Sequence, residues 1–132
     1  MTRPATTARK PGRAKRAAHW APERGEMIWI DHSPHSGREM AGPHPFLVLS
    51  PRTFNEKTGL VIGCAMTSKQ AHNPFAVANS ADPAQASFIL ADQPKSFDWR
   101  RRNARRHPWA KVTPEVLRDV CDRVEAIVQL CR

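Results

Sequence analysis

Short apolar runs, each closed by turn-forming residues, alternate with polar stretches along this chain. Runs of about four to eight residues that are rich in β-forming side chains predict buried strands rather than helices. We expect strands at 26–31 (EMIWID), 46–49 (FLVL), 60–66 (LVIGCAM), 74–78 (PFAVA) and 86–91 (ASFILA), and a short one at 97–99 (FDW). The Asp92-Gln93-Pro94 sequence is expected to end the strand before it.

The two strands at 46–49 and 60–66 form the centre of the predicted fold. The link between them is expected to be rich in turns, because Asn55 and the Thr58-Gly59 pair carry turn chemistry. His44 lies just before the first strand, and Thr67 and Ser68 follow the second. If the strands are antiparallel neighbours, these polar groups converge at one end of the pair, where rigid strands would suit a site.

Residues 32–45 (HSPHSGREMAGPHP) are predicted to form a long polar loop. The segment holds three prolines and two glycines, which argue against any regular element. Its charged members, Arg38 and Glu39, lie between the two glycines. Loops of this length in small domains are commonly functional.

One amphipathic helix is predicted at the C-terminal end. Thr113 is a favourable N-cap, Pro114 suits the first helical position and Glu115 suits the first turn. Apolar residues then recur at steps of three and four: Leu117, Val120, Cys121, Val124, Ile127, Val128 and Cys131. A mainly β chain with a C-terminal helix predicts a small, curved antiparallel barrel on which the helix packs.

The positive charge is concentrated near the N-terminus. Of the net +9, residues 1–24 contribute +6, from seven Lys and Arg against one Glu, so the other 108 residues contribute +3. Residues 1–23 are therefore predicted to be a basic, disordered extension and residues 24–132 a single domain. The extension has three interpretations: an electrostatic arm for RNA, a misassigned start, or an inert tail.

Composition excludes several other classes. No apolar run is long enough to span a membrane, and the N-terminal residues lack the apolar segment expected of a secretory signal. The three cysteines include no C-x-x-C pair and no Cys/His spacing that matches a zinc site. We expect buried thiols in a reducing cytoplasm, and no metal or cofactor.

A basic run follows the predicted strand at 97–99. Five arginines occur within seven residues, between Trp99 and Trp109: Arg100, Arg101, Arg102, Arg105 and Arg106. Such a run is either a solvated face or a phosphate-binding surface with indoles that stack on bases.

The motifs AGPHPFLVLSP, FN, KTGL and MTS resemble the core signature of the MazF/PemK toxin endoribonucleases. The likeness extends to RGEMIWIDHSPHSGREMAG upstream and to NPFAV, ILADQPKSFDWRRR and PEVLRDVCDRVEAIV downstream, so it covers roughly residues 24–130. It implies an SH3-like barrel of the kind shared with CcdB-type gyrase poisons, and a homodimer with an RNA groove near its interface.

The resemblance also implies a function. Proteins of this family are cytoplasmic toxins of type II toxin–antitoxin systems. They cut single-stranded RNA at specific sequences without a metal, and leave 2′,3′-cyclic phosphate and 5′-hydroxyl ends. An acidic antitoxin is the expected partner.

Two residues carry the catalytic expectation from the family. Thr67 matches the catalytic threonine, whereas His44 stands where the AGxRP pattern has arginine. Histidine can act as a general acid or base but is charged only part of the time at neutral pH. Either His44 takes over proton transfer while Arg38 or an arginine of 100–106 supplies charge, or the site is weakened, or His44 is only a polar strand-edge residue.

The Kid-type branch of the family adds a further candidate, Asp92, although Leu90 and Arg38 replace that branch's arginine and flap histidine. Asp92 also has a structural interpretation as a turn acid. Two interpretations stay open for Thr67 and Ser68: hydrogen bonding to a phosphate, or capping of the local backbone. The residues expected to contact RNA are Ser68, Lys69, Gln70, Glu39, Lys95, Trp99, Arg100 and Arg101.

Two alternatives remain at this stage. One is a catalytically silent homologue that binds RNA or an antitoxin, favoured by the loss of arginine at His44. The other is a CcdB-like gyrase inhibitor, which typically uses a C-terminal tryptophan, whereas this chain ends in Leu-Cys-Arg. Fold alone does not separate them.

Overall fold

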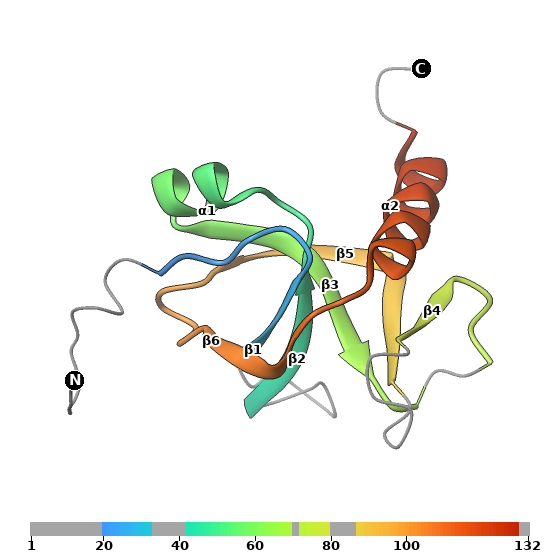
Figure 1. Ribbon diagram of the computed structural model, residues 1–132, viewed down its shortest axis with the longest axis horizontal. Coiled ribbons are helices and arrows are strands. Elements are labelled where there is room, and N and C mark those ends of the chain that lie inside the picture. The colour runs from blue at the N-terminus through green and yellow to red at the C-terminus, as the bar shows by residue number, and fades with distance from the viewer. Residues whose placement is uncertain (1–19, 33–41, 70–71, 80–86, 130–132) are drawn as a thin grey trace.

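The computed structural model describes residues 20–32, 42–69, 72–79 and 87–129 (Figure 1). These residues form one antiparallel sheet in the order β4-β5-β3-β2-β1-β6. Its strands are β1 (Glu26–His32), β2 (Gly42–Val48), β3 (Leu60–Thr67), β4 (Ala76–Asn79), β5 (Ser87–Asp98) and β6 (Arg105–Lys111). Two helices, α1 (Arg52–Thr58) and α2 (Pro114–Val128), complete the fold.

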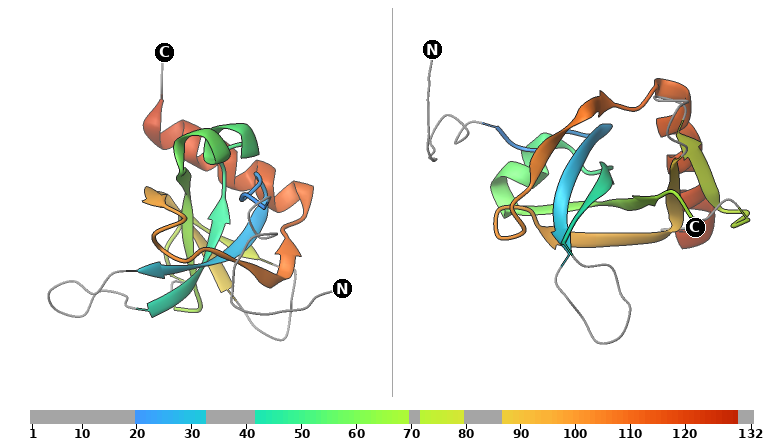
Figure 2. Two further views of the ribbon diagram at one scale, coloured as in Figure 1. Left: turned by 90° about the vertical axis from the view of Figure 1, so that its left-hand side faces the viewer. Right: turned by 90° about the horizontal axis from the view of Figure 1, so that it is seen from below.

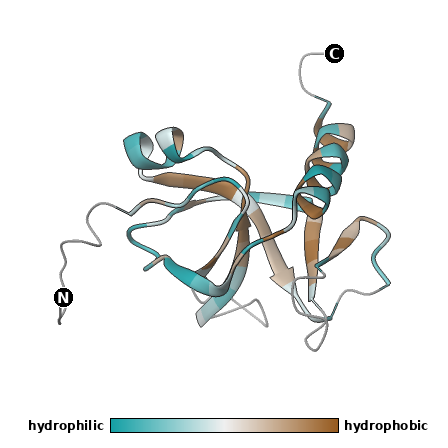
Figure 3. Cartoon of the chain, in the orientation of Figure 1, coloured by the Kyte–Doolittle hydropathy of each residue, from teal (hydrophilic) through white to brown (hydrophobic). Residues whose placement is uncertain are grey.

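The sheet curls strongly, and α2 lies across it beside β4 and β5 (Figures 1 and 2). In Figure 3 the apolar colouring is concentrated in β3 and in one half of β5, whereas α1 is mostly polar. The prediction of a mainly β, curved antiparallel fold with a C-terminal helix is confirmed.

Apolar side chains pack on both faces of the central strands. The face toward α2, called here the α2 face, carries Met27, Leu47, Cys64, Met66, Val77, Ile89, Ala91, Val112 and Val120. The other, called here the opposite face, carries Ala21, Ile28, Ile30, Phe46, Val48, Val61 and Trp99. Because successive side chains of a strand alternate between faces, each central strand contributes to both clusters. Each fully buried Val, Leu, Ile, Phe or Met side chain among them contributes about 1.5–3 kcal/mol.

The central antiparallel pair is confirmed. In the β2–β3 ladder Phe46 lies opposite Ala65 and Val48 opposite Gly63. Gly63 is required there by a close approach, since an added Cβ would lie 2.0 Å from the Leu47 carbonyl oxygen and 2.7 Å from the Phe46 ring. The two strands can meet this closely only because residue 63 has no side chain.

The predicted loop at 32–45 is wrong at both of its ends. His32 ends β1, and β2 begins at Gly42, four residues before the predicted strand start. Pro43 and Pro45 fit because the ladder to β3 begins only at Phe46, so the β2–β3 ladder loses no donor there. Only residues 33–41 of the predicted loop lie outside the described residues.

The turn-rich link predicted after β2 contains α1, so this prediction is wrong in part. Asn55 is a fully buried helix residue rather than a turn residue. Its Nδ2 donates to the carbonyl oxygens of Pro22 (2.8 Å) and Ser50 (3.0 Å), and its Oδ1 accepts from Ser50 Oγ (2.5 Å). The turn chemistry of Gly59 is confirmed, because this residue ends α1 at φ 75°. A helix this short shows no apolar periodicity in its sequence, and its stability depends on the buried Asn55 amide.

Two predictions about the second half of the sheet are also wrong. β5 continues through Asp92-Gln93-Pro94 to Asp98, with an irregular register between Cys64 and Met66 of β3 that absorbs the interruption. No separate strand exists at 97–99, since Trp99 begins the turn to β6. β6 was not predicted, because its sequence RRHPWAK shows neither an apolar run nor alternation.

The C-terminal helix is confirmed together with its N-cap. Thr113 Oγ1 accepts a hydrogen bond from Val116 N at 3.2 Å, and Pro114 occupies the first turn. Val120 is fully buried, but Ile127 and Val128 at the end of the predicted apolar face are exposed. Cys131 lies outside the described residues.

Residues 20–23 pack with the domain, although the sequence placed them in the basic extension. Ala21 and Pro22 are buried, and the Trp20 ring meets that of Trp99 edge to face at 5.8 Å. The packed domain therefore begins earlier than residue 24. The remainder of the extension, residues 1–19, lies outside the described residues.

Candidate functional site

His44 and Thr67 belong to neighbouring antiparallel strands of the sheet, β2 and β3. The ladder ends at the pair of Phe46 and Ala65, so the convergence of His44 and Thr67 that the strand order predicts stays a prediction. Both belong to the opposite face, because they lie an even number of residues from Phe46 and Val61 of that face. On its other side His44 lies across β1 from Ile30.

A row of aromatic rings leads from His44 across the opposite face. The His44 and His32 rings meet edge to face with centroids 5.3 Å apart, and His32 meets Phe97 at 5.0 Å. Phe97 in turn contacts Phe46 at 5.5 Å, and the Arg102 guanidinium carbon lies 4.9 Å from the Phe97 ring centroid. The row joins residues from β1, β2, β5 and the β5–β6 turn into one surface.

Positive charge surrounds this row. Burial lowers the pKa of His32 most, and the neighbouring His44 lowers it further. The Ile30 backbone acts in the other direction, while Lys95 and Arg102 add smaller depressions of the His32 pKa. An imidazole in this position is held neutral at neutral pH.

Thr67 has a local bond as well as a place at the site. Its Oγ1 accepts a hydrogen bond from the Lys69 backbone at 3.2 Å, which is the capping role that the sequence left open. The Thr67 hydroxyl hydrogen remains able to donate to a substrate oxygen. Ser68 and Lys69 follow at the surface and are exposed.

The arginine run divides between the turn after β5 and β6. Arg100 and Arg101 are exposed; the Arg100 guanidinium lies over the Trp99 ring at 4.5 Å, and the Arg101 backbone is held by Asp98. Arg105 pairs with Asp31 at 3.7 Å, and Arg106 with Glu26 at 3.9 Å. Of the run, Arg102 lies against the aromatic row.

Two further candidates lie in other surroundings. The Trp99 indole is buried, and its Nε1 donates to the Asn55 carbonyl oxygen at 2.7 Å, so the ring is part of the core. Asp92 is half-buried and accepts a hydrogen bond from Asn73 at 3.4 Å. Burial chiefly raises the pKa of the Cys64 thiol to about 12, and the charge of Asp92 adds to this effect. This bond to Asn73 suits the structural interpretation of Asp92.

Three predicted site residues, Arg38, Glu39 and Gln70, lie outside the described residues. Lys95 is described and exposed on β5, opposite Gly63 and thus on the same face as Val61.

Sequence reasoning missed His32, which it placed at the start of a loop. Two signals were available. Ile28, Ile30 and His32 continue one period-two series, and His44 follows the same parity as Phe46 on the partner strand. The sequence identified Arg102 only as one member of the basic run, without its place beside the aromatic row.

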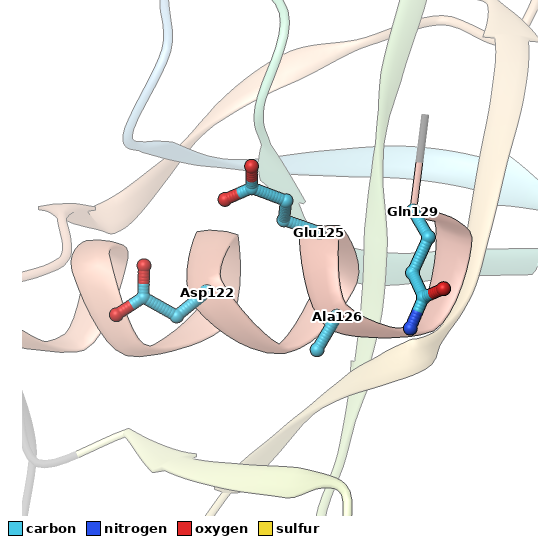
Figure 4. A pocket seen from close by; sticks show the side chains of 4 residues that line it. All are labelled: Asp122, Glu125, Ala126 and Gln129. Atoms are coloured by element: carbon cyan, nitrogen blue, oxygen red, sulfur yellow. The ribbon is translucent and has the colours of Figure 1, made fainter. Parts of the chain in front are cut away.

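Other hollows of the described surface differ from this site. One of about 400 Å³ lies along α2 and is lined by Asp122, Glu125, Ala126 and Gln129 (Figure 4); its acidic side chains do not suit an anionic ligand. Another, of about 480 Å³, lies between α2 and β3 and is mostly apolar, with Leu49, Ile62 and Val128 in its lining.

Within the described ranges, no three His, Cys, Asp or Glu side chains gather as metal ligands would. Among the helices described, none has the length and apolar character needed to cross a membrane.

The arrangement suits acid–base chemistry on an anion. His44 can move a proton, Thr67 can donate a hydrogen bond, and Lys95 and Arg102 can balance negative charge. A phosphodiester is an anion, and its cleavage requires proton transfer, hydrogen-bond donation and the balancing of negative charge.

Comparisons with known proteins point in the same direction. The profile of a family described as PemK-like, MazF-like toxin of type II toxin–antitoxin system matches residues 23–128. The endoribonuclease toxin MazF of Escherichia coli strain K12 is 34% identical over 111 residues, which span 84% of this chain and 97% of that protein.

Solved structures agree in fold. The crystal structure of MazF from Deinococcus radiodurans (Form-I) superimposes with a TM-score of 0.74 at 33% identity, covering 84% of this chain and 99% of that one. MazF in a MazE–MazF complex of the same organism (Form-III) gives a TM-score of 0.73 at 33% identity, covering 83% of this chain and 98% of that one.

Proposed function

This chain belongs to the PemK-like, MazF-like toxins of type II toxin–antitoxin systems, and we propose that it is an endoribonuclease whose site includes His44 and Thr67. The observation that supports the site is the gathering of His44, Lys95 and Arg102 around His32 on the opposite face, with Thr67 at the end of the neighbouring strand β3. The proposed substrate is single-stranded RNA, cut at a specific sequence.

The proposed reaction is an internal transesterification. The 2′-oxygen loses its proton and bonds to phosphorus, the bond from phosphorus to the 5′-oxygen breaks, and that oxygen takes a proton. The products are a 2′,3′-cyclic phosphate and a 5′-hydroxyl. His44 transfers protons, the Thr67 hydroxyl holds a phosphate oxygen, and Lys95 and Arg102 stabilise the phosphorane charge. Catalytic roles for Arg38 and Asp92 stay predictions.

RNA would continue from this site across the exposed basic surface. Ser68 and Lys69 follow Thr67 on one side, and Arg100 and Arg101 lie in the β5–β6 turn on the other. Phosphate contacts from these side chains supply affinity, while splayed bases supply sequence selectivity. Contacts to RNA from Gln70, Glu39 and Trp99 stay predictions, and the burial of Trp99 argues against stacking by its indole.

The proposed partner is an acidic antitoxin segment that covers the same basic surface and so competes with RNA. Related MazF has been crystallised with MazE, which supports this assignment. The proposed compartment is the cytoplasm, where both RNA and antitoxin are made.

The proposed assembly is a homodimer. Leu60, Ile62, Ile127 and Val128 are large apolar side chains left between 39% and 43% exposed, and two of them line the apolar hollow beside α2. A second copy of this chain would remove them from water. Analytical ultracentrifugation of wild type and Val128→Glu tests this surface, and a dimer unaffected by the substitution would place the interface elsewhere.

The test of the activity uses purified protein, with EDTA present, on a long RNA of mixed sequence, followed by mapping of 5′-hydroxyl ends. We expect cleavage at a short motif and its loss in His44→Ala and Thr67→Ala. Cleavage lost only in Thr67→Ala would assign proton transfer to a residue other than His44. RNA binding without cleavage on several RNAs would identify a silent binding homologue.

A further inference from the structure

His32 is an unusual residue for a buried position. Its side chain lies between the rings of His44 and Phe97 and the residue is 6% exposed. Neither ring nitrogen has a hydrogen-bond partner among the described residues, although the Ile30 backbone raises the pKa of His32. A buried donor and acceptor without partners destabilise the fold, and such groups commonly mark a functional site.

The charges around His32 are of one sign. His44 faces it from β2, Lys95 from β5 and Arg102 from the β5–β6 turn. Asp31 precedes it on β1, but its side chain alternates to the other face and pairs with Arg105 at 3.7 Å. No acidic side chain of the described residues balances the charge that His32 would carry when protonated.

We propose that His32 and His44 form a proton-linked phosphate site, in which an RNA phosphate bound on the opposite face brings one proton onto the imidazole pair. The inference rests on the proposed function and names the group that responds to the substrate. The bound phosphate supplies the negative charge that is absent from the side chains acting on His32, which are His44, Lys95 and Arg102.

The physical basis is electrostatic coupling across the ring contact. At a centroid separation of 5.3 Å, a charge on either imidazole disfavours a charge on the other, so the free pair avoids the doubly protonated state. An anion beside the pair favours protonation. The loaded pair then holds one charged and one neutral imidazole, which are the acid and the base that transesterification requires.

The experiment counts protons taken up on binding. Calorimetric titrations of a single-stranded 2′-O-methyl oligoribonucleotide, which lacks the attacking hydroxyl, are run near pH 7 in two buffers of different ionisation heat. We expect an uptake approaching one proton. Affinity should accordingly fall with rising pH, by up to about tenfold for each pH unit through the window of uptake.

Three variants test whether the proton uptake depends on His32. His32→Phe keeps an aromatic ring against His44 and Phe97 but removes both nitrogens, and should bind the probe with the proton uptake lost. His44→Gln, which leaves His32 in place, should reduce the uptake as well. His72→Gln, at an exposed histidine, is the matched control and should leave the uptake unchanged.

Parallel cleavage assays on unmodified RNA distinguish two kinds of failure. RNA cleavage without proton uptake by the wild type, or with the same uptake in folded His32→Phe, overturns this inference and leaves the proposed function standing. Absence of both probe binding and cleavage overturns both. Circular dichroism confirms that each variant is folded.

Discussion

The rings of His32 and His44 meet at an interplanar angle of 87°, with their centroids 5.3 Å apart. This contact joins β1 to β2 at the point where the ladder between β2 and β3 has already ended. It places a histidine that the core encloses against one that lies at the surface of the site.

His32→Phe should stabilise the folded protein. The substitution removes two buried polar atoms without partners and keeps the ring contacts, so the free energy of unfolding should rise by about 1–3 kcal/mol. Urea denaturation at pH 7 measures the change. A clear loss of stability would mean that the nitrogens of His32 have partners in solution.

Stability should fall as the pH is lowered below about 6.5. Burial lowers the folded-state pKa of His32 and His107, so the unfolded chain binds more protons than the folded one between the two pKa values. For His107 protonation also breaks the bond that its Nδ1 accepts from Trp109 N at 3.1 Å.

Denaturation midpoints at a series of pH values test this expectation. Stability should be greatest above the unfolded pKa near 6.5 and decline as the pH falls toward the lowered folded values. His32→Phe should make the decline shallower, and an unchanged slope in this variant would exclude His32 as a contributor.

Lys95→Gln and Arg102→Gln should weaken RNA binding and its dependence on salt. Each residue removed from phosphate contact is expected to lower the slope of log K against log salt by about 1. Binding to a 2′-O-methyl oligoribonucleotide at several salt concentrations gives this slope. The exposed Lys57 on α1 provides the control, and Lys57→Gln should retain the wild-type slope.

Asn55→Ala should strongly destabilise the domain. The change removes the amide that binds Pro22 and Ser50, so their carbonyl oxygens lose the donor that Asn55 supplies, at a cost of about 2–4 kcal/mol. Urea denaturation again measures the loss. Glu56→Ala, at the exposed neighbouring position, should change stability by less than about 0.5 kcal/mol.

Gly63→Ala should disrupt the central ladder. A Cβ at 2.0 Å from a backbone oxygen forces β2 and β3 apart, which is expected to cost about 3 kcal/mol or more. The control is Ser96→Ala on the adjacent strand β5, where the side chain is exposed. Equal midpoints for the two variants in thermal unfolding would contradict the close approach.

The parts of the fold that the sequence predicts are those with a strong local pattern. β3 reads as an uninterrupted apolar run, and α2 combines a good N-cap with a helical period. α1 has neither, since its stability comes from Asn55 reaching Pro22, far away in the chain. β6 becomes a strand because β1 offers it hydrogen-bond partners, a cause that its own residues do not display.

The site shows the same division. His44 and Thr67 were correctly assigned to neighbouring antiparallel strands, because the pairing of β2 with β3 follows from their order along the chain. His32 was missed because the predicted loop began at this residue, which is the last residue of β1. The predicted series of alternating buried side chains in β1 therefore ended at Ile30. The approach of Arg102 to Phe97 depends on the curl of the sheet and on the β5–β6 turn, which no local pattern encodes.

Because β6 lies at the edge of the sheet, its basic residues also affect the solubility of the protein. Among the described strands β6 lies at one end of the sheet and pairs with β1 alone, so its outer edge could accept a strand from another molecule. Arg105, Arg106 and Lys111 set like charges against any second copy of the same edge, and Pro108 withholds a donor there. Charge in this strand therefore guards the protein against edge-to-edge aggregation, and neutral variants of β6 would lose solubility before they lose their fold.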